Sequence, residues 1–190
     1  MEWSINMIMN DQEKVRDLYI KKDTLSIRVD LHKKYSVNTY GWGNWVFEQY
    51  EFMDNFNILE IGCGTADIWK NKSNKISENI NIILTDISEL MLKKAEENLS
   101  SNNKFSYKIM DIQDIPFPDN SFDIIIANHM LYHVPDLTKA LSEVNRTLKP
   151  NGIFYATTIG NDHLKDLQDI YRKYEDKVNF SYSDQLTFTL

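Results

Sequence analysis

The sequence predicts an α/β protein with a mainly parallel, doubly wound sheet and helices on both of its faces. Apolar runs of strand length, such as 57–61, 81–86 and 153–159, alternate with segments of helical periodicity. Glycines follow the first run, and an acidic residue closes the second. Parallel strands need crossover helices between them, so this order favours a Rossmann-like sheet.

The first strand leads into a glycine loop. Gly62, Cys63 and Gly64 follow it, and the residues beyond read as a helix start. Glycines let backbone N–H groups approach a ligand, and a helix N-terminus adds partial positive charge. Asp67 stands where a dinucleotide site needs Gly or Ala, and its carboxylate would repel a pyrophosphate. An NAD-dependent oxidoreductase is therefore disfavoured, and a plain tight turn is the other alternative.

The second strand ends at Asp86, about twenty residues after the glycines. In nucleoside-binding α/β folds, a carboxylate at this position accepts hydrogen bonds from the ribose hydroxyls. Ser88 is expected to cap the next helix, whose predicted apolar face consists of Met91, Leu92, Ala95 and Leu99. A further helix is predicted from Leu137 to Leu148, with Asp136 as its cap and a turn at residues 150–152.

The segment 105–134, with Asp111, Ile112 and the run 124–128, adds the motifs of one enzyme family. Together with the turn at 148–152, it resembles class I S-adenosylmethionine (SAM) methyltransferases, in particular the ubiquinone and menaquinone biosynthesis subgroup. The resemblance covers roughly residues 57 to 160 and implies that Asp111 reaches the adenine amino group, that Ile112 offers its N–H to the ring, and that Asn128 lies beside the methionyl portion. The remaining residues expected at the cofactor are Tyr40, Glu60, Gly62, Cys63, Gly64, Asp86, Ile87 and Met91.

Methyl transfer to a small-molecule acceptor, with S-adenosyl-L-homocysteine (SAH) as the product, is the function that the resemblance implies. The Pro-Pro-Tyr or Pro-Pro-Phe loop expected of enzymes acting on amino groups of nucleobases or glutamine is absent from residues 128–131. If the acceptor is a hydroxyl, His129 and His133 are candidate bases, and capping or packing is the alternative role of each. A SAM-binding protein without catalysis is the second hypothesis.

Composition limits the partners. The chain has 190 residues and a formal net charge of −7, which is a poor match to a nucleic-acid backbone. No apolar run reaches the ~20 residues of a membrane span, and we expect neither a membrane partner nor a metal. The single cysteine, Cys63, fits a reducing, cytoplasmic setting.

We predict one domain over 1–190, with a helical N-terminal cap at 1–55, a cofactor-binding core at 56–160 and an incomplete C-terminal part at 161–190. In the cap, a hydroxyl of Tyr40 or Tyr35 is expected to bond the SAM carboxylate, and most other aromatic side chains are expected in the core. After the fifth strand the family has another helix and two more strands. We expect truncation of a longer parent in preference to a short hairpin at 179–190. We also expect the edge at 153–159 either to be covered by residues 178–190 or to associate with another chain, and little turnover by this chain alone.

Overall fold

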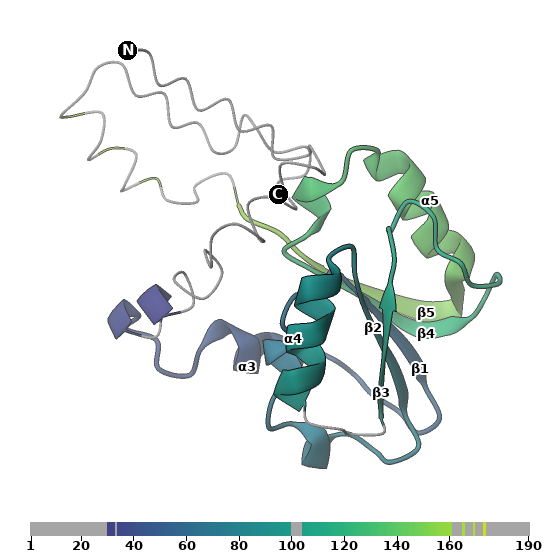
Figure 1. Cartoon of the computed structure of the whole chain (residues 1–190), viewed down its shortest axis with the longest axis horizontal. Helices are drawn as coiled ribbons and strands as arrows, with labels where there is room; N and C mark the ends of the chain where they lie inside the picture. Colours follow the sequence, from purple (N-terminus) through teal and green to yellow (C-terminus); the bar gives the residue numbers. More distant parts are fainter. Residues whose placement is uncertain are drawn as a thin grey trace.

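The computed structural model describes residues 30–32, 34–99 and 104–160, together with Lys165, Asp169 and Lys173. Most of the predicted C-terminal part and the first 29 residues of the predicted cap lie outside the described residues. Five parallel strands form one sheet in the order β3-β2-β1-β4-β5 (Figure 1). The strands are β1 (Asn57–Ile61), β2 (Asn81–Asp86), β3 (Phe105–Ile109), β4 (Phe122–Asn128) and β5 (Leu148–Thr157). The predicted α/β class is confirmed.

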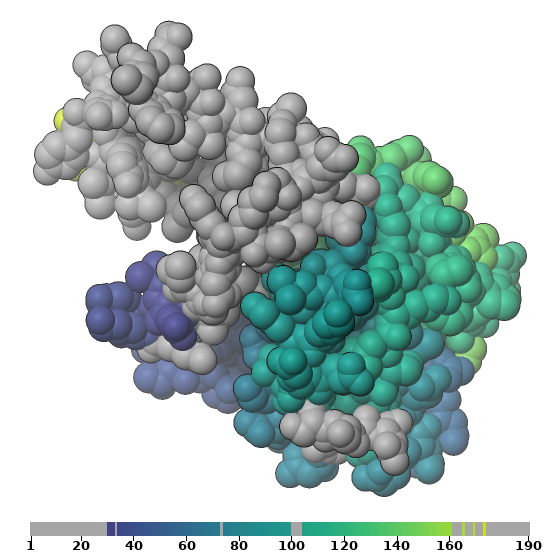
Figure 2. Space-filling view, in the orientation of Figure 1, coloured from purple at the N-terminus to yellow at the C-terminus, as the bar shows by residue number. Residues whose placement is uncertain are grey.

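Both faces of the sheet are covered, because alternate strand residues enter two separate apolar clusters. Ile58, Ile82 and Ile124 pack in one cluster with residues of α3 (Trp42–Phe47) and α4 (Glu89–Leu99). Leu59 and Ile125 pack in the other with residues of α5 (Leu137–Thr147). Figure 1 shows α4 and α5 on opposite sides of the sheet, and in the same orientation Figure 2 shows teal residues in the region of α4 and β3 at the front of the molecule.

Two predicted helix caps are present. The amide of Met91 donates to Ser88 Oγ at 3.4 Å, and the four residues of the predicted α4 face are buried. Asp136 Oδ1 accepts from the amide of Lys139 at 2.9 Å. On α5, Ala140 and Val144 are buried, whereas Leu141 is 37% exposed.

The predicted helix after the glycine loop is wrong. Between β1 and β2 the structure has two 3₁₀ turns, η1 (Asp67–Trp69) and η2 (Ser73–Lys75). Asn71 interrupts the segment with φ +60°, and Asn and Ser side chains compete with helical backbone hydrogen bonds. The helix dipole inferred for this loop is therefore absent, and the amides of Cys63 and Gly64 donate to the Thr85 carbonyl and to Asp86.

Strand β5 also differs from the prediction, since it begins at Leu148 instead of Ile153 and ends at Thr157 instead of Ile159. Leu148 pairs with Phe122, and the register shifts before Ile124. The residues predicted as a turn form this irregular start, where Asn151 has φ +65°. Asn128, expected just past β4, is its last residue. Within the described residues, β5 pairs only with β4.

A buried lysine attaches α3 to the sheet domain. Lys72 Nζ lies 2.7 Å from Asn44 Oδ1 and 4.6 Å from the ring centroid of Phe47. Burial lowers the pKa of this ammonium.

The aromatic side chains of residues 35–50 differ in burial. Phe47 and Tyr50 are buried, whereas four others are at least two-fifths exposed, namely Tyr35, Tyr40, Trp42 and Trp45. The expectation that most of them belong to the core holds only for part of the segment.

Candidate functional site

The glycine loop turns sharply at the carboxyl end of β1. Gly62 and Gly64 have φ +67° and +55°, in the left-handed region that favours glycine. A Cβ at Gly62 would lie 2.9 Å from the Cβ of Met130, so the loop also packs closely against the segment after β4. The amide of Cys63 donates to the Thr85 carbonyl at 2.9 Å. These contacts hold the loop beside the end of β2.

Asp86 lies directly against this loop. Its Oδ2 accepts from the amide of Gly64 at 3.0 Å, and its Oδ1 accepts from the amide of Ser88 at 2.8 Å. Burial raises the pKa of the carboxyl, and the amide donors oppose that rise. A carboxylate has about four acceptor positions on its two oxygens. The amides therefore leave acceptor capacity on Asp86 for a hydroxyl group of a ligand.

Glu60 and Asn128 form a buried polar network beneath the loop. Glu60 is 2% exposed, and its two oxygens accept from Trp69 Nε1 and, at 3.2 Å, from Asn128 Nδ2. Burial raises the pKa of Glu60 to about 7. Asn128 Nδ2 also donates to the Tyr50 hydroxyl at 2.8 Å. The network orients the Asn128 side chain at the end of β4.

Two further predicted cofactor residues, Asp111 and Ile112, follow the end of β3. Asp111 accepts from the amide of Gln113 at 2.9 Å, and Ile112 is 2% exposed. Because Ile109 pairs with Asp86, the residues after β3 lie at the same sheet edge as the glycine loop. Ile87 directly follows Asp86, and Met91 is buried in the first turn of α4.

The two histidines lie in the segment after β4, and each contacts an aromatic ring. The His129 ring centroid is 4.8 Å from that of Trp42, and that of His133 is 4.5 Å from Tyr132. His129 has φ +50° and its amide donates to the Thr157 carbonyl at 3.0 Å. The geometry is compatible with packing roles as well as with proton transfer.

Tyr40 and Cys63 complete the predicted set. The Tyr40 hydroxyl donates to Glu48, and this hydrogen bond raises the pKa of Tyr40. The described hydrogen bonds of Tyr40 go to Asn38, to Asn44 of α3 and to Glu48, the C-cap of α3. None of them goes to the glycine loop. Burial raises the pKa of the Cys63 thiol well above its usual value. A protonated thiol is a poor nucleophile, so the raised pKa argues against a nucleophilic role for Cys63.

The structure thus brings Gly64 to Asp86 and Glu60 to Asn128, as the order of strands requires. Sequence reasoning missed Tyr50, Trp69 and Gln113, which hold these side chains from distant parts of the chain. Only the aromatic density around Tyr50 gave a signal for them.

Fold and site together define a nucleoside-binding α/β protein, with its polar residues at the carboxyl ends of parallel strands. The family model described as a methyltransferase domain matches residues 59–156. The chain therefore belongs to the class I SAM-dependent methyltransferase family.

Individual relatives agree with this assignment. The ubiquinone/menaquinone biosynthesis C-methyltransferase UbiE of Rickettsia bellii is 37% identical over 132 residues, which are 65% of this chain and 52% of that protein. UbiE of Rickettsia typhi is 34% identical over 182 residues, covering 91% of this chain and 67% of the relative. The chain thus spans between half and two thirds of the length of these curated relatives.

A solved SAM-dependent methyltransferase from Aquifex aeolicus has the same fold, with a TM-score of 0.52 and 22% identity. The match covers 62% of this chain and 65% of that one.

Proposed function

We propose that this chain binds SAM across the carboxyl ends of β1 and β2 and transfers its methyl group to a small-molecule acceptor. The observation that carries the proposal is the contact of Asp86 with Gly64, which brings a partly buried carboxylate at the end of β2 against the glycine loop at the end of β1. Asp86 would accept from both ribose hydroxyls, whose spacing suits one carboxylate.

The neighbouring strands offer partners for the rest of the cofactor. Asp111 and Ile112, after β3, would contact the base, and Asn128, at the end of β4, would lie by the methionyl portion. Glu60 would act through Asn128, because its oxygens accept from Asn128 and Trp69. Gly62, Cys63, Ile87 and Met91 would form the remaining wall. Tyr40 would have to exchange its bond to Glu48 for one to the SAM carboxylate.

SAM, when bound, supplies a methyl group on a positively charged sulfur. The protein's residues have to hold the acceptor in line with that methyl group and exclude water. For an acceptor that must lose a proton, His129 or His133 would accept it, since neutral imidazole is a competent base near pH 7. His129 already contacts the exposed ring of Trp42, which could flank an acceptor there.

The acceptor we propose is a ring carbon of a quinone-type molecule, because the curated relatives are named as C-methyltransferases of ubiquinone and menaquinone biosynthesis. We also propose a reducing, cytoplasmic setting, for which the single cysteine argues. Among the residues that the structure describes, no helix is both long and apolar enough to cross a bilayer. Self-association along β5 stays a prediction.

Calorimetric titration with SAM tests the cofactor site. Asp86→Ala removes a charged acceptor, and a hydrogen bond to a charged group contributes ~1.5–3 kcal/mol, so affinity should fall at least tenfold. Asp67→Ala is the matched control, since Asp67 lies in the same loop and its side chain accepts from Thr65. Equal affinities of the two variants and the original chain would reject the ribose assignment.

Turnover is a separate measurement. Incubation with SAM and a demethylated quinol, the reduced form whose ring carbon is nucleophilic, should yield SAH, a released proton and a product heavier by one methylene, detected by mass spectrometry. Binding of SAM without product from any acceptor tested would favour the hypothesis of a SAM-binding protein without catalysis.

A further inference from the structure

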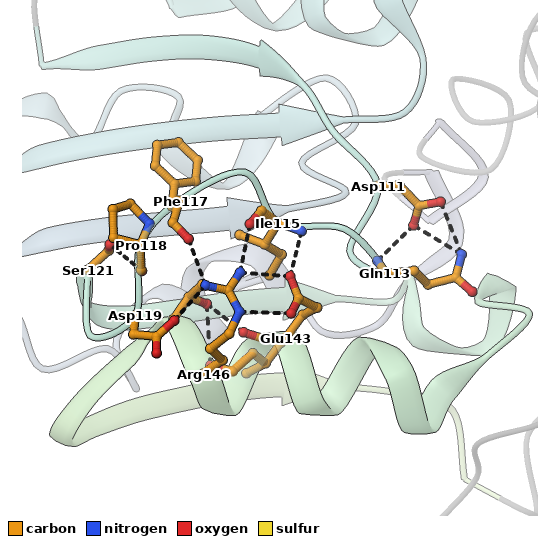
Figure 3. A network of polar contacts seen from close by, with 11 residues as sticks. Asp111, Gln113, Ile115, Phe117, Pro118, Asp119, Ser121, Glu143 and Arg146 are labelled. Carbon is orange, nitrogen blue, oxygen red and sulfur yellow. Dashed lines mark hydrogen bonds and ion pairs between the residues drawn. The ribbon is translucent and has the colours of Figure 1, made fainter.

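Gln113 connects the turn after β3 with the N-terminus of α5, to which the proposed function assigns no role. It lies in the turn after β3, and its Nε2 donates to both carboxylate oxygens of Asp111, at 3.2 Å and 3.0 Å. Its Oε1 accepts from the amide of Asp136, the N-cap of α5, at 3.0 Å. Figure 3 shows the Gln113 side chain turned toward Asp111 beside one end of α5. The Nε2 donor thus meets an acceptor and the Oε1 acceptor meets a donor, which fixes the orientation of the amide group.

The Asp111 carboxylate is consequently held from two directions. The backbone amide of Gln113 donates to Oδ1 at 2.9 Å, and the side-chain amide spans both oxygens. Rotation of the carboxylate would break these bonds together. The side chain of Gln113 therefore controls where Asp111 points, and the bond to Asp136 keeps Gln113 itself from turning.

Because of its position, the orientation of Asp111 would affect which nucleoside base the site prefers. The amide of Met110 donates to the Asp86 carbonyl at 3.2 Å, so Asp111 follows β3 beside the end of β2. A nucleoside with its ribose on Asp86 would extend its base toward β3. Ionised carboxylates only accept hydrogen bonds, so Asp111 would favour a base that carries an amino group over one that carries an oxygen at that place.

We propose that Gln113 is a positioning residue for Asp111 and thereby sets the preference of this site for a 6-amino purine over a 6-oxo purine. The inference rests on the proposed SAM site. Without the Nε2 donor, the carboxylate loses the contact that spans both of its oxygens, its orientation is less restricted, and the preference for the amino group falls.

Gln113 is not needed to hold the loop itself. Glu143 Oε2 accepts from the amide of Ile115 at 2.9 Å, and Arg146 donates to the carbonyls of Ile115 and Phe117, each at 2.8 Å (Figure 3). These bonds attach residues 115–117 to α5 independently. Removal of Gln113 should therefore leave the fold in place and act on Asp111.

The test compares two ligands by calorimetric titration of the full chain. One is SAH, and the other is S-inosyl-L-homocysteine, in which an oxygen replaces the 6-amino group. Gln113→Met keeps the length of the side chain without its polar atoms. Gln113→Glu keeps an acceptor for Asp136 but replaces the donor to Asp111 with a second acceptor. Both variants should reduce the affinity ratio of SAH to the inosyl analogue about tenfold.

Glu143→Gln is the matched control, because it weakens the attachment of the same loop without removing a contact of Asp111. It should lower both affinities by a similar factor and leave the ratio unchanged. The inference is overturned if Gln113→Met or Gln113→Glu keeps the original ratio, or if the control changes it equally. If the original chain binds neither ligand, the proposed SAM site itself is wrong, whereas binding with an unaltered ratio in the Gln113 variants rejects only the role of Gln113.

Discussion

The Glu60 carboxylate and the Asn128 side-chain amide join the ends of the two central strands, with 3.2 Å between Oε1 and Nδ2. Glu60 belongs to β1 and Asn128 to β4, and these strands pair in parallel. The second carboxylate oxygen accepts from Trp69, so the bond is part of a network that includes η1. A buried carboxylate with neutral donors has no full positive charge to offset its desolvation, and its proton affinity rises accordingly.

This rise predicts a pH dependence of stability. Burial raises the pKa of Glu60 from 4.5 to about 7, so between these values the folded protein keeps a proton that the unfolded chain has released. The stability contributed by Glu60 is therefore fully present below pH 4.5 and is lost as the pH rises toward 7, by about 1.4 kcal/mol per unit at most. Urea unfolding of the original chain and of Glu60→Gln at several pH values should show the variant gaining relative stability over this window. Parallel curves would contradict the prediction.

Gly62 is expected to tolerate no side chain. Alanine there would combine positive φ with a contact of 2.9 Å to Met130 Cβ, which the Met130 side chain cannot relieve by rotating. A left-handed backbone costs about 1–2 kcal/mol and overpacking about 1–3 kcal/mol, so Gly62→Ala should reduce the free energy of unfolding by roughly 2–5 kcal/mol. Gly43→Ala is the control, since it is helical and meets only Ile68 at 4.0 Å. It should be neutral or stabilising by up to about 1 kcal/mol. Equal losses of unfolding free energy in both variants would show that the positive φ and the Met130 contact at Gly62 do not exclude a side chain.

Lys72 should determine how firmly α3 is attached. Lys72→Met keeps the apolar stem but removes the bond to Asn44 and the cation above Phe47, which together stabilise by about 1–3 kcal/mol. Amide hydrogen exchange in α3 should accelerate while exchange in β1 and β4 stays slow. Lys70→Met, at an exposed neighbour whose Nζ lies 3.5 Å from Asn98, should leave both rates unchanged. Unchanged exchange in α3 of the Lys72 variant would mean that the lysine is not its anchor.

The strands and the caps of α4 and α5 could be predicted because their signals are local. Residues 57–61 and 81–86 carry an apolar run closed by a turn or an acid, and Ser88 and Asp136 precede periodic apolar residues. The meeting of Asp86 with the glycine loop also followed, since adjacent parallel strands end at the same sheet edge.

The side chains that orient the site could not be predicted in the same way. Tyr50 reaches Asn128 across 78 residues, and Lys72 reaches Asn44 across 28. Such partners depend on packing between elements and leave no periodic pattern. The segment after the glycine loop was mispredicted for a related reason, because buried Trp69 and Ile76 hold it against the sheet without a regular helix.

The ion pair on α5 should give a pH dependence opposite to that of Glu60. Arg146 donates through Nε and a terminal nitrogen to the two oxygens of Glu143, each at 2.8 Å, and these bonds lower the pKa of Glu143 from 4.5 to about 2. Above pH 4.5 the unfolded and folded chains are both ionised and the contribution is complete. It is lost as the pH falls from 4.5 toward 2, because the folded protein resists protonation longer than the unfolded chain.

Glu143→Gln should therefore be less stable than the original chain at pH 6, and the difference should shrink as the pH is lowered to 3. Urea midpoints measured at pH 6, 4.5 and 3 provide the test. Arg146→Lys separates charge from geometry, since a lysine keeps the charge but cannot reach Glu143 and the carbonyls of Ile115 and Phe117 together. We expect Arg146→Lys to be less stable than the original chain at pH 6, because the carbonyls of Ile115 and Phe117 lose their donor. A lysine variant as stable as the original chain would show that the charge alone holds the loop to α5.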